Sequence, residues 1–244
     1  MKWFMCIALA AFMMTSCSSA FARTIENSDG SLPFVRWVVY RGSAQDIEKA
    51  AEIRSQYTEA GVSERPDIYA MYGGIDSAAP GIYRGLEIYR DKQSYEAYAQ
   101  SRAYQAYTTA IAPLVQKEQE LRAEAFHLEA KPQGQAVMVR LARLVIDPKH
   151  LDEYKAALRE EIVDSVANEP GVKALLATTE AEHPNIFHLL EIYENQDAYE
   201  RHIAGPYFQK YNKIVQSFVQ DKHLILNKEQ PLQLSEHPAA SKIS

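Results

Sequence analysis

The sequence predicts an α+β protein made of two copies of one unit. The stretch LEIYRDKQSYEAY, Leu86 to Tyr98, returns as LEIYENQDAYERH, Leu190 to His202. The offset is 190 − 86 = 104, and without a gap it gives 17 identical residues over the 82 positions from Val35 to Gln116. Both copies alternate strand-like and helix-like patterns. A repeat held without gaps over this span indicates a tandem duplication. The repeated unit of roughly 100 residues has an ordinary domain size.

The elements are clearest in the second copy. Residues 137–146, VMVRLARLVI, form an apolar, β-branched run closed by Asp147-Pro148, which predicts a strand. Residues 150–169 carry apolar side chains at helical spacing and end at Pro170-Gly171, so they predict a helix. Residues 172–180 and 186–194 predict the second and third strands, joined by a turn.

A second helical region begins near Gln196 and is interrupted at Gly205-Pro206, where proline cannot continue the hydrogen-bond ladder. Residues 223–227 close the copy as a fourth strand. The order β-α-β-β-α-β is the ferredoxin-like split motif, and the first copy repeats it. One such unit leaves one sheet face bare. We therefore expect residues 32–130 and residues 135–230 to press these faces together, forming a dimeric α/β barrel within one chain.

The first 22 residues predict export. Lys2 precedes an apolar run, and Ala20-Phe21-Ala22 fits the cleavage rule of a secretory signal peptide. The run is shorter than the about 20 apolar residues of a membrane-spanning helix. The segment MTSC also resembles a bacterial lipobox, so a lipid anchor at Cys17 is the alternative. We expect a periplasmic or secreted protein that meets a membrane only through that anchor.

Cysteine and charge content exclude several classes. Cys6 and Cys17 are the only cysteines and both lie in the leader, which leaves the two units without a disulfide, a catalytic thiol or a thiolate metal site. The net charge of −6, with both signs interspersed, argues against nucleic acid as a partner. His183 and His188 have no accompanying carboxylate cluster, so we expect no metal. Residues 23–31 predict a linker, and residues 231–244 a disordered tail.

The segment 189–211, LLEIYENQDAYERHIAGPYFQKY, carries a more specific signal. It has an E-x-Y at the end of the third strand, an aromatic residue in the next helix, a histidine three residues on, and a PYF segment. In these features the second copy resembles the antibiotic biosynthesis monooxygenase family of the dimeric α/β barrel superfamily. The resemblance implies oxidation of a quinol or another phenolic small molecule by O2 without a cofactor, and association into a homo-oligomer.

Haem degradation, another activity in this superfamily, is not favoured. The positions that would carry its asparagine, tryptophan and histidine match Ala142, Tyr193 and Asn212. The alternative to a monooxygenase is a non-catalytic periplasmic module that binds a hydrophobic small molecule, with haem a less favoured ligand.

His202 is the first candidate catalytic residue, because an imidazole with a pKa near 6.5 can deprotonate a phenol at neutral pH. The alternative is a structural histidine bonded to the carbonyls freed at Gly205-Pro206. Since the first copy has Tyr98 at this position, we expect the second unit to hold the better-formed, polar-lined pocket.

Glu191 is the second candidate, as a group that orients a substrate oxygen. The alternative is a structural ion pair with Arg140, repeated by Glu87 with Arg36, because burying a lone carboxylate costs several kcal/mol. Otherwise Arg140 is a candidate for substrate binding. Aromatic residues that could line a pocket, or form plain core, are Phe187, Tyr193, Tyr199, Phe208 and Tyr211.

Overall fold

The computed structural model describes residues 22–131, 138–226 and 235–236. The first unit consists of β2 (Phe34–Arg41), α1 (Ala44–Glu64), β3 (Ile68–Ile75), β4 (Ile82–Tyr89), α2 (Lys92–Ala99), α3 (Arg102–Ile111) and β5 (Lys117–Ala130). The second consists of β6 (Met138–Ile146), a 3-10 turn (Pro148–His150), α4 (Leu151–Asn168), β7 (Val172–Glu180), β8 (Ile186–Tyr193), α5 (Gln196–Ala204), α6 (Pro206–Val215) and β9 (Val219–Leu226).

The duplication is confirmed at the level of elements. β6 starts 138 − 34 = 104 residues after β2, and the same offset separates the starts of β7 from β3, β8 from β4, α5 from α2 and α6 from α3. The helix break also falls where it was predicted, since Gly205 ends α5 and Pro206 opens α6. Proline suits a first helical position because its missing N–H has no partner there.

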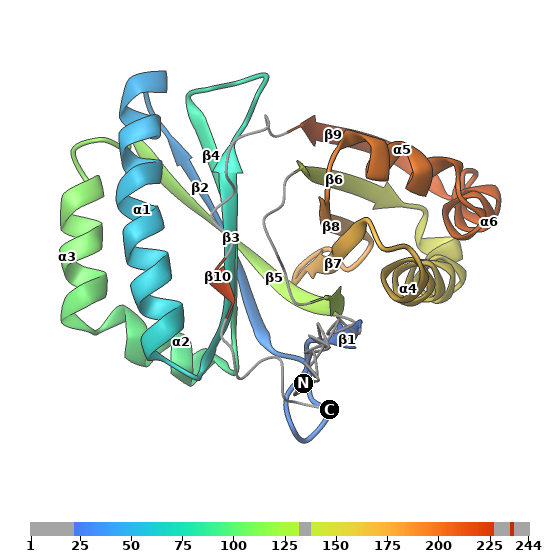
Figure 1. The fold of residues 1–244 in the computed structure, drawn as a ribbon, viewed down its shortest axis with the longest axis horizontal. Helices are drawn as coiled ribbons and strands as arrows, with labels where there is room; N and C mark the ends of the chain where they lie inside the picture. Colours follow the sequence, from blue (N-terminus) through green and yellow to red (C-terminus); the bar gives the residue numbers. More distant parts are fainter. Residues whose placement is uncertain (1–21, 132–137, 227–234, 237–244) are drawn as a thin grey trace, which may run out of the picture.

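The strands form one curled antiparallel sheet in the order β10-β3-β4-β2-β5-β7-β8-β6-β9. Each unit contributes the ferredoxin-like order, and the long strand β5 joins the two. Its first part, Lys117 to Arg122, pairs with β2, and its second part, Ala123 to Ala130, pairs with β7. Figure 1 shows β5 crossing from one half to the other, with the helices of each half on the outer faces.

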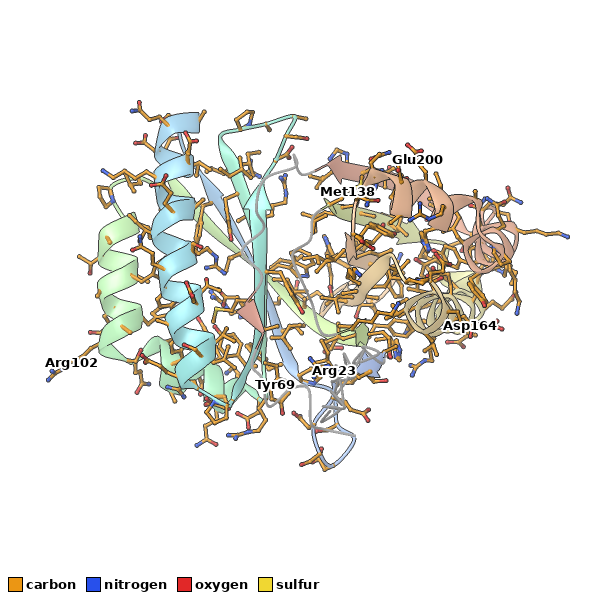
Figure 2. All side chains as sticks on the ribbon, in the orientation of Figure 1. Arg23, Tyr69, Arg102, Met138, Asp164 and Glu200 are labelled. Atoms are coloured by element: carbon orange, nitrogen blue, oxygen red, sulfur yellow. The ribbon has the colours of Figure 1, made fainter. Side chains whose placement is uncertain are left out.

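The two halves of this curled sheet, one from each unit, pack face to face, as predicted. Their inner faces share one apolar core, which includes Val35, Trp37, Leu86 and Ile88 from the first unit and Val139, Leu141, Leu190 and Ile192 from the second. Figure 2 shows side chains filling the space between the halves. A polar contact also crosses it, because the indole Nε1 of Trp37 donates to Thr178 Oγ1 at 2.9 Å. Two further cores lie between each sheet and its own helices.

Two short strands correct the expectations for the linker and the tail. Within the expected linker, β1 (Arg23–Thr24) pairs with the end of β5. Within the expected disordered tail, β10 (Ser235–Glu236) pairs with Met71 and Ala70 of β3. The end of β5 pairs with the matching Leu175 and Ala174 of β7, so β10 takes the place on the first unit that β5 takes on the second. The expected signal peptide, residues 1–22, lies outside the described residues except for Ala22.

None of the helices in the described ranges combines the length and apolar character required to cross a membrane.

Candidate functional site

The candidate site lies in the second unit, between the outer face of its sheet and helices α4, α5 and α6 (Figure 1). A cavity of about 30 Å³ lies there. That volume matches the share of one water molecule in the liquid. Its lining is mainly apolar and is broken by two carboxylates, an imidazole and a phenol: Leu158, Glu161, Ile162, Leu175, Leu176, Leu189, Glu191, His202, Phe208 and Tyr211.

His202 lies at this cavity and is only 2% exposed. Helix α5, capped by the side chain of Asn195, carries it onto the buried face. The imidazole is flanked by two carboxylates of α4 and its C-cap, with Nδ1 3.1 Å from Glu169 Oε2 and Nε2 3.5 Å from Glu161 Oε1. The imidazole nitrogens therefore contact carboxylates, whereas the structural alternative required the backbone carbonyls at Gly205-Pro206.

The charge state of His202 follows from these neighbours. Burial acts to lower its pKa, but the hydrogen bond to Glu169 and the nearby carboxylates outweigh burial and raise the pKa above its ordinary value. The ring is wedged between aromatic side chains, with centroids 5.4 Å from Tyr193 and 5.3 Å from Phe208. The raised pKa thus favours the protonated form of an imidazole that is buried and held in a fixed orientation.

Glu161 is the residue that the sequence analysis missed. It is 6% exposed, and burial raises the pKa of its carboxyl to about 7 against the opposing charge of His202. Ser165, one turn on, donates its hydroxyl to Glu161 Oε1 at 3.0 Å. The sequence pattern could have indicated Glu161, because Glu161 and Ser165 interrupt the apolar stripe of α4. Leu158 and Ile162 of that stripe are buried in the core.

Glu191 enters the site from β8 and is half-buried. The predicted ion pair with Arg140 is wrong, although the two residues are directly opposed in the sheet register. The Arg140 guanidinium instead lies over the Tyr199 ring, 3.9 Å from its centroid. The Tyr193 hydroxyl donates a hydrogen bond to the Glu191 carboxylate at 3.0 Å. Among the described contacts, this carboxylate therefore lines the cavity without a salt bridge to Arg140.

The predicted aromatic residues differ in where they lie relative to the cavity. Phe208 and Tyr211 line the cavity, and the Tyr211 hydroxyl donates to Tyr154 at 3.2 Å. Tyr193 contacts both Glu191 and His202, while Tyr199 and Arg140 stack beside the cavity without lining it. Phe187 packs edge-on against Tyr154 in the core, 4.8 Å between centroids, and does not line the cavity.

The first unit has the same frame with different chemistry. Arg36 donates to Glu87 at 2.8 Å, as predicted, and Arg54 of α1 donates to the other Glu87 oxygen at 2.7 Å. Burial acts to raise the pKa of Glu87, but the two guanidinium groups outweigh it and lower the pKa to about 2. Position 54 + 104 is Leu158 in the second unit, so the second copy lacks this arginine. Glu87 is therefore a structural carboxylate whose negative charge is balanced by two arginines.

The expectation that the second unit holds the better-formed pocket is wrong for size. A groove of about 600 Å³ lies in the first unit, beside Tyr98, whereas the cavity at His202 is about 30 Å³. Tyr57 and Tyr98 occupy the positions that match Glu161 and His202, so this glutamate–histidine pair has no counterpart in the first unit.

Of the other histidines that the structure describes, His127 contacts Glu129 at 3.3 Å, His188 contacts Glu180 at 2.9 Å, and His183 is exposed in its turn. Within the ranges that the structure describes, no group of three or more histidine, cysteine or carboxylate side chains has an arrangement that could hold a metal ion.

The fold and the matched residues define the class of protein. The family model described as antibiotic biosynthesis monooxygenase matches residues 137–214. A protein from Bacteroides thetaiotaomicron, described as a putative antibiotic biosynthesis monooxygenase, is 47% identical over 90% of its own chain and 38% of this one, with a TM-score of 0.37. The chain belongs to the antibiotic biosynthesis monooxygenase family.

Longer solved structures share the tandem fold at lower identity. A protein from Lactobacillus acidophilus described as a putative monooxygenase has a TM-score of 0.78, is 15% identical, and is matched over 96% of its chain and 84% of this one. An anthrone oxidase-like protein has a TM-score of 0.57 at 10% identity, over 93% of its chain and 84% of this one. No curated protein sequence matches the chain.

Proposed function

We propose that the protein is an exported, cofactor-independent monooxygenase that oxidises a quinol or a related phenol with O2, using the second unit. The observation that supports it best is the convergence of buried Glu161, buried His202 and half-buried Glu191 on one cavity of the family domain. The matching positions 57 and 98 of the first unit hold tyrosines instead. Titratable groups with shifted pKa values that converge on a cavity are typical of catalytic sites.

The reaction balances without a further reductant. A quinol that gains one oxygen atom as a hydroxyquinone loses two hydrogens, and these leave with the second oxygen atom as water. The substrate supplies all the electrons, so the protein has to remove a proton and stabilise the anion that passes an electron to O2. Both tasks fall to side chains.

Glu161 and His202 divide these tasks. A carboxyl with a pKa of about 7 is partly ionised at neutral pH, so Glu161 can take the phenolic proton. The raised pKa of His202 favours the cationic form of its ring, and a cation next to the cavity stabilises both the phenolate and reduced oxygen. Because the two groups are in contact, they titrate as a pair. Glu191 is placed to accept a hydrogen bond from a second substrate hydroxyl.

The volume of the cavity fits O2 but not an aromatic substrate. About 30 Å³ accommodates a molecule the size of water or O2, whereas sites for drug-sized ligands occupy about 300–1,000 Å³. An aromatic substrate therefore requires α6 to move, since Phe208 and Tyr211 of that helix line the cavity. Gly205 separates α5 from α6 and is the natural hinge.

Oxygen uptake with a panel of hydroquinones tests the proposal. The parent should consume O2, Glu161→Gln should lose nearly all turnover, and His202→Ala should lose most of it. His183→Ala, an exposed turn histidine, is the matched control and should keep parental activity. If the parent shows no uptake but binds a panel member at micromolar concentration, the non-catalytic binding module is the correct function.

Export has a separate test. Expression of the full chain in a bacterium, followed by mass spectrometry, should yield a mature protein that begins at Arg23 or a lipidated protein that begins at Cys17. An intact N-terminus in the cytoplasmic fraction would refute export.

A further inference from the structure

Glu169 is a third carboxylate beside His202, and the reaction proposed above gives it no task. It is the C-cap residue of α4, and its Oε2 lies 3.1 Å from His202 Nδ1. Its side chain is 19% exposed, whereas those of His202 and Glu161 are 3% and 6% exposed. Glu169 is not among the residues that line the cavity. It therefore contacts His202 from outside the cavity.

The two ring nitrogens of His202 have different carboxylate partners. Nδ1 faces Glu169, and Nε2 lies 3.5 Å from Glu161 Oε1, so the imidazole bridges the two carboxylates. The contact with Glu169 is the shorter of the two and is at hydrogen-bond distance. The hydrogen bond that one ring nitrogen makes decides which nitrogen keeps the proton in a neutral imidazole. This geometry keeps the proton on Nδ1 and leaves Nε2 to exchange a proton with Glu161.

Hydrogen bonds hold the backbone of Glu169 in place. Its N–H donates to the Ser165 carbonyl at 2.9 Å. Its own carbonyl accepts from the Lys131 ammonium at 2.7 Å and from the Val172 N–H at 3.0 Å. Lys131 is 7% exposed and directly follows β5, the strand that joins the two units. These bonds fix the point from which the carboxylate reaches His202.

The first unit shows that the fold does not require an acid at this position. Its residues at the three matching positions are Tyr57, Arg65 and Tyr98. They also contact one another, because the two tyrosine rings stack with centroids 5.3 Å apart and the Arg65 guanidinium lies 5.4 Å from the Tyr98 centroid. The fold therefore accepts a cation here, and an acid is present only in the unit whose neighbouring residue is a histidine.

Other titratable groups also face His202 from the elements packed against it. Glu161 comes from α4, Glu191 and Tyr193 come from β8, and Tyr211 comes from α6. Burial lowers the pKa of His202, and the hydrogen bond to Glu169 is the largest of the contributions that raise it. Loss of the Glu169 charge should therefore change the titration of His202 more than loss of the Glu191 charge.

We propose that Glu169 is a positioning residue of the candidate site, which holds the Nδ1 proton of His202 and thereby directs Nε2 at Glu161. This inference rests on the proposed function, because it gives Glu169 a part in the same proton transfer. Glu161 takes the phenolic proton while the His202 cation stabilises the anion. Glu169 supplies the negative charge that maintains this cation, and it acts through His202 without touching the substrate.

Nuclear magnetic resonance of the histidine ring nitrogens in the full chain tests the positioning without turnover, with the His202 signal assigned by its loss in His202→Asn. In the parent, the neutral ring should carry its proton on Nδ1. Glu169→Gln keeps the shape and an acceptor but removes the charge, so the pKa of His202 should fall by about 1, since a nearby opposite charge shifts a pKa by about 1–3. Glu153→Gln, which removes the carboxylate 3.4 Å from the exposed His150, is the matched control and should leave His202 unchanged.

A pKa of His202 that does not fall in Glu169→Gln, or a neutral parental ring that carries its proton on Nε2, would overturn the positioning. The second criterion uses the parent alone, so it decides the question even if Glu169→Gln does not fold.

The pH profile of oxygen uptake tests the part of Glu169 in turnover. The alkaline limb of kcat, where the His202 cation loses its proton, should lie about 1 pH lower in Glu169→Gln than in the parent or Glu153→Gln. An unchanged limb would overturn this part. No uptake by the parent would overturn the proposed function and the part of Glu169 in it, while the ring measurements would still decide the positioning.

Discussion

Glu87 and Glu191 occupy matching positions, yet the structure predicts opposite consequences when each is changed to glutamine. Glu87 accepts from Arg36 at 2.8 Å, from Arg54 at 2.7 Å and from the Tyr89 hydroxyl at 2.9 Å. Glu87→Gln leaves two buried guanidinium groups without a negative charge. Breaking a buried ion pair from one side costs about 3–5 kcal/mol.

The pKa of Glu87 gives a second measure of this cost. Two arginines lower the pKa from 4.5 to about 2 in spite of burial, and a difference of this size corresponds to roughly 3 kcal/mol. Since the folded-state pKa is depressed, this stability is present above pH 4.5 and is lost as the pH falls through about 2. The two measures agree within their precision.

Glu191→Gln should cost far less. Its half-buried carboxylate accepts a hydrogen bond from the Tyr193 hydroxyl, so the loss is about 1 kcal/mol. For a chain of this size each kcal/mol moves the melting temperature by about 2–4 °C. We therefore expect a decrease of about 10 °C for Glu87→Gln and about 3 °C for Glu191→Gln at pH 7.

Thermal unfolding followed by far-ultraviolet circular dichroism, from pH 7 down to pH 2, measures both variants against the parent. The deficit of Glu87→Gln should shrink as the pH approaches 2, where the parental carboxylate also gains its proton. Equal deficits for the two variants at pH 7, or a Glu87→Gln deficit that does not change with pH, would refute the assigned ion-pair network.

Three further outcomes follow from the same structure. Because burial raises the Glu161 pKa to about 7, the parent loses stability as the pH rises from 4.5 through 7. In urea unfolding, the free energy of unfolding of Glu161→Gln should therefore gain up to roughly 3 kcal/mol relative to the parent between pH 5 and pH 8. A difference that stays constant with pH would contradict this assignment. Gly61→Ala should lower the thermal midpoint although alanine favours helices, and adding Tyr98→Phe should restore part of the loss; an increase in the midpoint for the single variant would exclude the clash. A double-mutant cycle of Trp37→Phe with Thr178→Val should give a coupling of about 1 kcal/mol across the two units, and additive effects would show that their hydrogen bond does not contribute.

Much of the fold could be predicted because the sequence contains the same order of elements in two copies. A weak strand or helix pattern in the first unit gains support from the same pattern 104 residues later. The residue opposite Arg36 could also be predicted, since strand order and alternation place Glu87 beside it. Strand β10 could not be predicted, because two residues carry no periodic pattern and their pairing depends on an edge of β3 formed far away in the chain.

Sequence by itself determined the duplication, the order of elements, the helix break at Gly205-Pro206 and the residues His202 and Glu191 as inward-facing polar groups. Only the tertiary structure decided their chemistry. Whether the charge of the carboxylate is balanced depends on which helix residue packs beside it. That residue is Arg54 at Glu87, and it is Leu158 at the cavity that Glu191 lines. Burial and the approach of charges set pKa values, and both arise from packing between elements distant in sequence.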